Sequence, residues 1–304
     1  MRRSVLLILC LLLCLSCANV GTGQEAGLSS PAPADTQVPD PTAAPSQTPQ
    51  TEPPAAVPDG QSAAVPDETP APTVAPISDG DLDAGALDAW FEGSVMIGDS
   101  LVSGLSAYVL SETDKGHVCL DGMQLVGASA LTLKKAAAAE RHEREAELKF
   151  RKHYLTASEI VDEVQAKRLF IMLGVSNLRW FGIDELIEVY GQFIDAVRAD
   201  HPDLKIYVHS LMPMVKDYAA QVGVDYETNK AANERLRAFC EEHGYVYLEL
   251  ADLVRDGDGY LKYEYSAQDY RFHLNNAGKA IWVRLLRSCA RDEYYAGTWK
   301  PEDH

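Results

Sequence analysis

Between residues 94 and 291 the sequence alternates short apolar runs with segments of helical periodicity, and this alternation restricts the fold more than any other feature. The apolar runs are too short for buried helices, whereas the segments between them place apolar residues at three- and four-residue spacing. Strands that alternate with helices predict a parallel sheet covered by helices on both faces, a three-layer α/β/α architecture. The five predicted strands are residues 94–97, 123–126, 169–173, 205–209 and 245–250.

The helical segments carry recognisable signals of their own. Residues 136–154 are rich in alanine and charge, which predicts a solvated helix. Thr156 and Glu159 form a capping-box pattern that predicts the start of another helix. The remaining helices are predicted at residues 101–110, 184–199, 228–243 and 276–291.

The first eighteen residues have the pattern of an export signal. Arg2 and Arg3 precede an apolar run over residues 5–14, which is shorter than the roughly 20 residues that span a bilayer. Ser16 before Cys17 resembles a bacterial lipobox, in which Cys17 would be lipidated and become the new N-terminus. The alternative is cleavage after Ala18. We therefore predict a membrane-anchored lipoprotein at the cell surface, or a secreted protein if cleavage follows Ala18.

Residues 19–80 have the composition of a linker. Thirteen of the sixteen prolines lie between Pro31 and Pro76, and no aromatic residue precedes Trp90. Such a segment cannot bury enough apolar surface to offset its chain entropy, and proline keeps it extended. The predicted organisation is a signal over residues 1–18, a disordered acidic linker over 19–80 and one domain over 81–304.

Charge and cysteine content exclude several classes of protein. A net charge of −18 argues against a nucleic-acid partner, because such proteins need a basic face. Cys119, Cys240 and Cys289 remain in the domain without a C-x-x-C pair, which favours buried free thiols over disulfides or a zinc site. No phosphate-binding or metalloprotease motif occurs in the domain, so we predict neither a cofactor nor a metal.

Side chains suited to ester hydrolysis follow the predicted strands. The first strand runs into Gly98, Asp99 and Ser100 just before a helix, where a serine hydroxyl is exposed near the positive helix end. His273 precedes the last helix, with Asp269 four residues upstream. A serine nucleophile needs a base within hydrogen-bond reach and benefits from a carboxylate that fixes the tautomer of that base. Since the carboxyl ends of parallel strands share one edge of the sheet, we expect these groups to meet there.

Two further strand ends offer hydrogen-bond donors for a developing oxyanion. The second strand ends at Gly127, which lets a backbone N–H approach a ligand. The third ends in Gly174, followed by Ser176 and Asn177.

These blocks resemble the SGNH/GDSL hydrolase family over residues 93–291. The tripeptide at residues 98–100 matches the nucleophile block of the family, and Gly127 looks like the glycine of its oxyanion hole. The resemblance implies a flavodoxin-like fold, with Ser100 as nucleophile, His273 as base and the backbone N–H groups of Ser100 and Gly127 as oxyanion donors.

Two positions depart from the family pattern. The family asparagine of the third block falls on Ser176, and Asn177 occupies the next position. In the fifth block, Asp-x-x-His, the residue three before His273 is Tyr270, and Asp269 is one residue farther away. We therefore predict that Ser176 or Asn177 is the side-chain donor to the oxyanion, and that Asp269 is the carboxylate that orients His273.

The predicted function is that of an extracytoplasmic serine esterase that removes O-acyl groups, such as acetyl, from a cell-wall or other polysaccharide. Two alternatives stay open: a lipid esterase, and a catalytically weakened relative that binds a glycan without turning it over.

Overall fold

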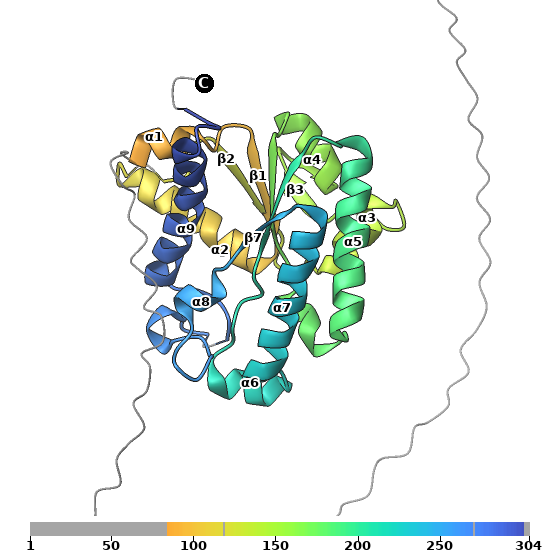
Figure 1. Cartoon of the computed structure of the whole chain (residues 1–304), viewed down its shortest axis with the longest axis vertical. Coiled ribbons are helices and arrows are strands. Elements are labelled where there is room, and N and C mark those ends of the chain that lie inside the picture. Colours follow the sequence, from red (N-terminus) through yellow and green to blue (C-terminus); the bar gives the residue numbers. More distant parts are fainter. Residues whose placement is uncertain (1–83, 118, 270, 301–304) are drawn as a thin grey trace, which may run out of the picture. The chain divides into compact units, whose positions relative to one another are not determined.

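The computed structural model describes residues 84–117, 119–269 and 271–300 (Figure 1). The predicted export signal with Cys17, the predicted linker and Tyr270 lie outside the described residues. Within those ranges, no helix is long and apolar enough to cross a membrane.

The centre of the domain is a five-stranded parallel sheet, as the sequence predicts. Its strands lie in the order β2-β1-β5-β6-β7. The register of β1 against β2 pairs Gly98 with Gly127, so both strands end at the same level. The strands are β1 (Ser94–Gly98), β2 (Met123–Gly127), β5 (Arg168–Met172), β6 (Lys205–His209) and β7 (Val246–Leu248).

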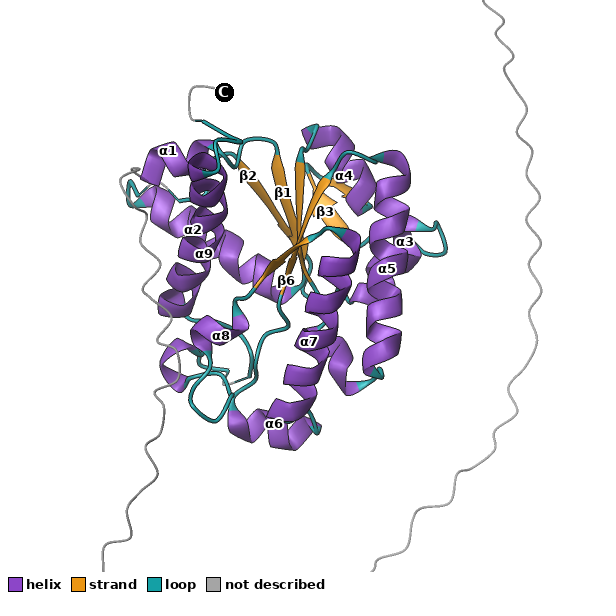
Figure 2. Cartoon of the chain, in the orientation of Figure 1, coloured by secondary structure: helices purple, strands orange, loops and turns teal. Residues whose placement is uncertain are grey.

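Helices cover both faces of this sheet, which gives the predicted three layers (Figures 1 and 2). On one face α9 contacts both α1 and α2, and on the other α5 contacts α3, α4 and α7. The first group is α1 (Ala84–Ala89), α2 (Ser100–Asp114) and α9 (Asn276–Tyr295). The second is α3 (Leu133–Glu140), α4 (Ala157–Val164), α5 (Ile183–Asp200) and α7 (Tyr226–His243). The short helices α6 (Lys216–Val222) and α8 (Ala251–Val254) lie in the connections around β7.

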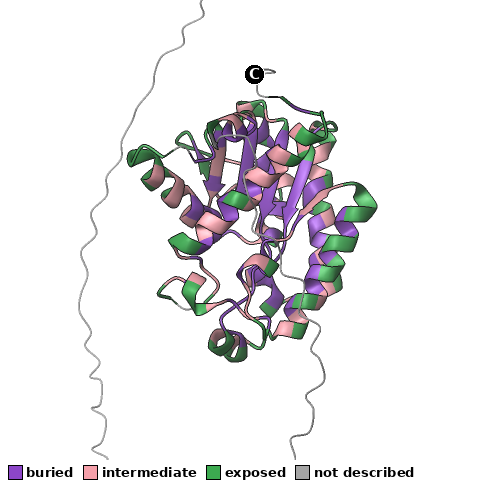
Figure 3. Ribbon diagram, turned by 60° about the vertical axis from the view of Figure 1, so that its left-hand side comes forward, coloured by how far each residue is buried: buried purple, intermediate pink, exposed green. Residues whose placement is uncertain are grey.

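The core lies between the sheet and these helices. Every residue of β1 and β5 is buried, and Figure 3 shows the buried strands enclosed by helices whose outer faces are exposed. An aromatic cluster closes one end, where the rings of Phe170 and Tyr207 stack with centroids 4.3 Å apart and Trp90 meets both rings edge-on. Because both faces of the sheet are covered, the central strands β1 and β5 are buried along their whole length rather than at alternate residues.

The predicted helix over residues 136–154 is wrong. The helix α3 ends at Glu140, and an antiparallel hairpin follows, formed by β3 (Leu148–Phe150) and β4 (His153–Leu155). Arg151 and Lys152 both adopt positive φ, as a two-residue hairpin turn requires. Buried Leu148 and Phe150 flank exposed Lys149, a two-residue period that the charged, alanine-rich composition obscures. The alanines of α3 are themselves largely buried, so this helix is not solvated.

Several local predictions are confirmed. The capping box joins Thr156 and Glu159 at the start of α4. Cys119 and Cys240 are buried free thiols, and Cys289 is a partly buried one.

Candidate active site

The end of β1 places Ser100 on the first turn of α2. Gly98 must lack a side chain, because a Cβ there would lie 2.5 Å from the carbonyl oxygen of Met172. The buried carboxylate of Asp99 caps the helix by accepting the N–H of Leu101 at 2.9 Å. Burial raises the pKa of Asp99 to about 6, although the Leu101 N–H opposes this rise. Residues 98–100 therefore form a sharp turn from β1 into α2, and Ser100 is the first residue of that helix.

The structure brings Ser100, His273 and Asp269 together. Ser100 Oγ lies 2.8 Å from His273 Nε2, and Asp269 Oδ2 hydrogen bonds to His273 Nδ1 on the other side of the ring. A carboxylate can only accept, so Nδ1 carries a proton and Nε2 of the neutral imidazole is free to accept the Ser100 O–H. This is the arrangement of a nucleophile, a base and a group that orients the base.

The loop before α9 explains how Asp269 reaches the imidazole from four residues upstream. The N–H of Ala267 donates to the carbonyl of His273 at 2.8 Å, which closes the loop on itself. The N–H of Arg271 donates to Asp269 Oδ1 at 3.3 Å and leaves Oδ2 for the histidine. The extra residue relative to the family spacing is thus accommodated within the loop.

Gly127 packs directly against the first turn of α2. A Cβ at this position would lie 2.6 Å from Ser103 Oγ and 2.9 Å from the carbonyl oxygen of Asp99. Only glycine lets β2 approach the nucleophile turn this closely. The structure therefore places Gly127 beside the turn that carries Ser100, at the carboxyl end of its strand.

The third block forms a single turn of 3₁₀ helix over Val175–Arg179, and it places Asn177 and Ser176 differently. Asn177 is buried, and its Oδ1 accepts the N–H of Leu133 at 3.2 Å. That bond identifies the oxygen end of the side-chain amide. The nitrogen, Nδ2, makes no hydrogen bond to a described residue. Ser176 is only partly buried, and its hydroxyl likewise bonds to no described residue. Gly174, with φ of +107°, provides the left-handed turn that starts this segment.

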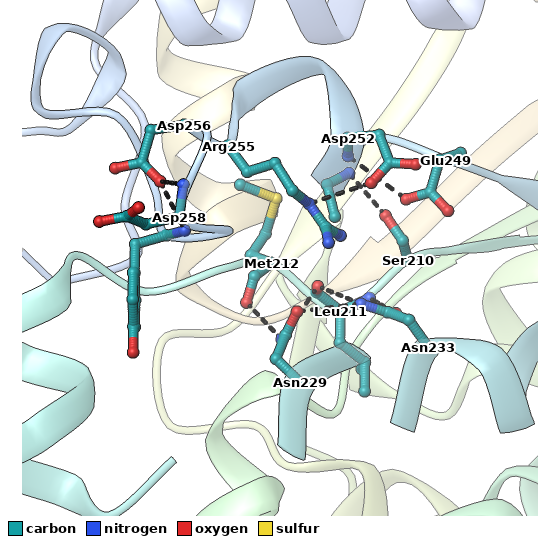
Figure 4. Close-up of polar contacts among 12 residues, drawn as sticks. Ser210, Leu211, Met212, Asn229, Asn233, Glu249, Asp252, Arg255, Asp256 and Asp258 are labelled. Atoms are coloured by element: carbon teal, nitrogen blue, oxygen red, sulfur yellow. Dashed lines mark hydrogen bonds and ion pairs between the residues drawn. The ribbon is translucent and has the colours of Figure 1, made fainter. Parts of the chain in front are cut away.

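A polar network joins the chain after β6 to α7 and to the start of α8 (Figure 4). Asn233 Oδ1 accepts the N–H of Leu211 at 2.7 Å, and Asn233 Nδ2 donates to the carbonyl of Leu211 at 3.0 Å. Asn229 donates to the carbonyl of Met212 at 3.1 Å, and Ser210 Oγ accepts the N–H of Ala251 at 2.8 Å. These side chains replace the hydrogen bonds that a regular strand would supply to an irregular buried segment.

The same segment supports the loop over residues 266–274, which carries His273 and is called the base loop below. The N–H of Val215 donates to the carbonyl of Arg271 at 2.7 Å, midway between Asp269 and His273. The sequence gives no signal for this support, because residues 210–215 and the loop before α9 are far apart along the chain.

His209, at the end of β6, lies behind the site rather than in it. It is fully buried, donates through Nδ1 to the carbonyl of Ile171 at 3.0 Å and accepts the Trp282 indole N–H at Nε2 at 2.9 Å. Burial lowers its pKa to about 4, so it stays neutral. Both ring nitrogens are occupied, which makes this histidine a packing residue.

Two pockets lie near the site. A pocket of about 330 Å³ contains the catalytic candidates and is lined by Ser100, Leu101, Gly104, Ala267, Asp269, His273, Leu274, Lys279 and Trp282. A larger one of about 760 Å³ begins at Ala128, directly after Gly127, and extends to the hairpin. Its polar lining includes Ser129, His142, Arg144, Glu145, Glu147, Tyr154, Thr156 and Glu159. The described residues contain no group of three or more His, Cys, Asp or Glu side chains that could hold a metal ion.

Comparison with known proteins finds the same kind of domain. The model of the GDSL-like lipase/acylhydrolase family matches residues 96–281. A proposed acylhydrolase from Bacteroides fragilis is similar in structure, with a TM-score of 0.51 and 12% identity, over 66% of this chain and 86% of that one. None of the curated proteins matches this chain.

Two other solved structures are less similar. A GDSL-like lipase from Bacteroides thetaiotaomicron has a TM-score of 0.49 and 13% identity, over 66% of this chain and 87% of that one. A carbohydrate acetylesterase from Sinorhizobium meliloti has a TM-score of 0.41 and 15% identity, over 67% of this chain and 99% of that one.

Proposed function

Because the chain belongs to the GDSL-like lipase/acylhydrolase family, we propose that it is a serine ester hydrolase that removes O-acyl groups from a carbohydrate. The observation that carries the proposal is the 2.8 Å contact between Ser100 Oγ and His273 Nε2, with Asp269 on the opposite ring nitrogen. Such a chain of hydrogen bonds activates a hydroxyl that is otherwise a poor nucleophile at neutral pH.

The reaction follows from this geometry. His273 Nε2 takes the proton of Ser100 while Oγ attacks the ester carbonyl, and Asp269 stabilises the resulting imidazolium. The backbone N–H groups of Ser100 and Gly127 and the amide of Asn177 bind the oxyanion. The imidazolium then protonates the departing alcohol, which leaves an acyl-enzyme. A water molecule deprotonated by His273 attacks the acyl group, and the carboxylic acid and free Ser100 are released.

The polar lining of the larger pocket favours a hydroxylated substrate over a lipid. Eight of the twelve residues that line it carry charged or polar side chains and the other four are alanines, whereas a long acyl chain needs a continuous groove of larger apolar side chains. Trp180, three residues after Asn177, is 74% exposed and offers a flat apolar surface next to the third block.

Hydrolysis of 4-nitrophenyl acetate by wild type, Ser100→Ala and His273→Ala tests the chemistry. We expect both variants to lose activity, while Ser111→Ala, at an exposed serine near the far end of α2, keeps it. Equal inactivity of wild type and Ser100→Ala on a broad panel of esters would instead favour a glycan-binding protein.

Acetylated oligosaccharides and triacylglycerols test the substrate class. We expect turnover of the oligosaccharides, with a higher KM in Trp180→Ala. Tyr295→Ala, at an exposed aromatic residue at the end of α9, should leave KM unchanged. Turnover of the lipids alone would point to a lipid esterase.

We also propose that the enzyme acts outside the cytoplasm, attached to a membrane through lipidated Cys17. The support is the pattern of residues 1–18 followed by the proline-rich segment. In its native host, wild type should fractionate with membranes and Cys17→Ala should not. A wild-type protein found wholly in the medium would indicate cleavage after Ala18.

A further inference from the structure

One cation in the pocket beside Ser100 has no role in the reaction just described. Lys279 lies on the first turns of α9 and lines the same pocket as Ser100 and His273. Its amine sits over Gly104, since a Cβ added at Gly104 would lie 3.6 Å from Lys279 Cε and 3.8 Å from Nζ. Gly104 is one helical turn after Ser100, so the ammonium faces the pocket close to the nucleophile.

Among the residues that the structure describes, this ammonium has no counter-ion. It makes no ion pair or hydrogen bond to any residue in the described ranges. The carboxylate in the pocket, that of Asp269, is committed to His273. Burial lowers the pKa of Lys279, and no carboxylate in the described part of the chain opposes that effect. A partly buried, unpaired cation is costly unless something else compensates its charge.

The other walls of the pocket strengthen any charge interaction within it. Leu101, Leu274 and Trp282 are almost fully buried and form apolar walls. Electrostatic attraction is much stronger in such surroundings than in water. A substrate anion would also need a dedicated cation here, because acidic residues outnumber basic ones over residues 84–300.

We propose that Lys279 is a specificity residue that binds a carboxylate carried by the ester substrate, next to the bond that Ser100 cleaves. A lone ammonium is a compact point charge with three hydrogen-bond donors, and its single positive charge balances the single negative charge of a carboxylate. This inference rests on the proposed ester hydrolysis at Ser100. The carboxylate belongs either to the acyl group or to the alcohol, and the two sources are distinguished by experiment.

The test compares two matched pairs of esters. For the acyl side, 4-nitrophenyl hydrogen succinate is compared with its methyl ester; for the alcohol side, 4-acetoxybenzoate is compared with methyl 4-acetoxybenzoate. In one pair, wild type should have the higher kcat/KM for the anion. Lys279→Met should lower the anion-to-neutral ratio in that pair about 10- to 100-fold, the usual range for loss of a charged hydrogen bond. Lys279→Arg should retain most of the ratio.

The control is Lys230→Met, which makes the same change in charge on α7, outside this pocket. It should leave both ratios as in wild type. A wild type without preference in either pair, or a Lys279→Met variant that loses anionic and neutral activity equally, overturns the inference while the ester hydrolase stands.

Binding without turnover separates this inference from the proposed function. Calorimetry with Ser100→Ala should show that monomethyl succinate or 4-acetoxybenzoate binds more tightly than its neutral ester. In Ser100→Ala/Lys279→Met that difference should disappear. If wild type hydrolyses no ester, the proposed function fails, and this binding measurement alone decides the role of Lys279. The role of Lys279 is refuted if Ser100→Ala and Ser100→Ala/Lys279→Met show the same preference for the anionic ligand.

Discussion

Asn177 holds the backbone of Leu133 through its side chain: Oδ1 accepts the Leu133 N–H at 3.2 Å, across 44 residues of sequence. The bond joins the third block to the start of α3, just beyond the loop that follows Gly127. It also shows which end of the amide is available, because the oxygen accepts this bond and the nitrogen bonds to no residue in the described ranges. The donor that an oxyanion needs is therefore available on Asn177.

We expect Asn177→Ala to lower kcat about 10²- to 10³-fold, the loss measured elsewhere for one oxyanion donor. Asn177→Asp should lose at least as much, although its carboxylate still accepts the Leu133 N–H and keeps the loop in place. Ser176→Ala and Ser176→Asn should change kcat only slightly. Steady-state kinetics with circular dichroism checks these values. If Ser176→Ala proved the damaging change and Asn177→Asp stayed active, Ser176 would be the donor.

The sheet could be predicted from the sequence because its strands are buried on both faces. Residues 95–97 and 169–173 are continuous apolar runs, and each is followed by a glycine that marks its end. The hairpin around Arg151 could not be predicted in the same way. Its strands are three residues long, and two alternating apolar residues in a charged segment are too weak a signal against the helix propensity of the alanines.

In the candidate site, too, some residues could be predicted from the sequence and others could not. Ser100, Gly127 and His273 stand at strand ends or before a helix, where the topology alone brings them together. The choice between Ser176 and Asn177 depends on a single turn of 3₁₀ helix, which spacing cannot reveal. Lys279 has only a weak signal in the sequence, namely its position one turn into the helix after His273. That it has no ion-pair partner among the described residues is seen only in three dimensions.

Gly127→Ala should be damaging for two reasons. Its Cβ would meet Ser103 Oγ at 2.6 Å and would push β2 away from the turn that carries Ser100. Overpacking of this kind typically costs about 1–3 kcal/mol of stability, and a displaced N–H would weaken oxyanion binding. We expect a lower urea midpoint together with a large fall in kcat. Gly182→Ala, at a glycine whose Cβ would meet nothing within 4 Å, is the control. Unchanged kcat in Gly127→Ala would show that the turn tolerates this displacement.

Asn233→Ala should destabilise the protein and impair the base loop. The change leaves the Leu211 N–H buried without its partner, and a buried unpaired group costs about 1–3 kcal/mol. Since this segment leads to Val215, which holds the Arg271 carbonyl, kcat should also fall. Glu234→Ala, at the exposed neighbouring position, should change neither the unfolding free energy nor kcat. An Asn233→Ala protein as stable as wild type would mean that water or Asn229 replaces the lost bonds.

Glu140 should make stability depend on pH in the direction opposite to that of a typical ion-paired carboxylate. Its carboxylate accepts the N–H groups of Ala157 and Ser158 at the start of α4. Burial nevertheless raises its pKa from 4.5 to about 7. Between these two values the folded protein keeps a proton that the unfolded chain has lost. The free energy of unfolding contributed by Glu140 therefore falls as pH rises through this window.

Glu140→Gln removes this titration, so its free energy of unfolding should rise relative to that of wild type between pH 4.5 and 7. The difference should be constant below and above that window. Urea unfolding of both proteins at pH 4.5, 5.5, 6.5 and 7.5 measures it. Asp99 and His209, whose pKa values are about 6 and about 4, titrate in both proteins and cancel in the difference. Glu145→Gln, at an exposed carboxyl nearby, should run parallel to wild type. Parallel curves for wild type and Glu140→Gln would show instead that the two backbone N–H groups compensate fully for the burial of the carboxylate.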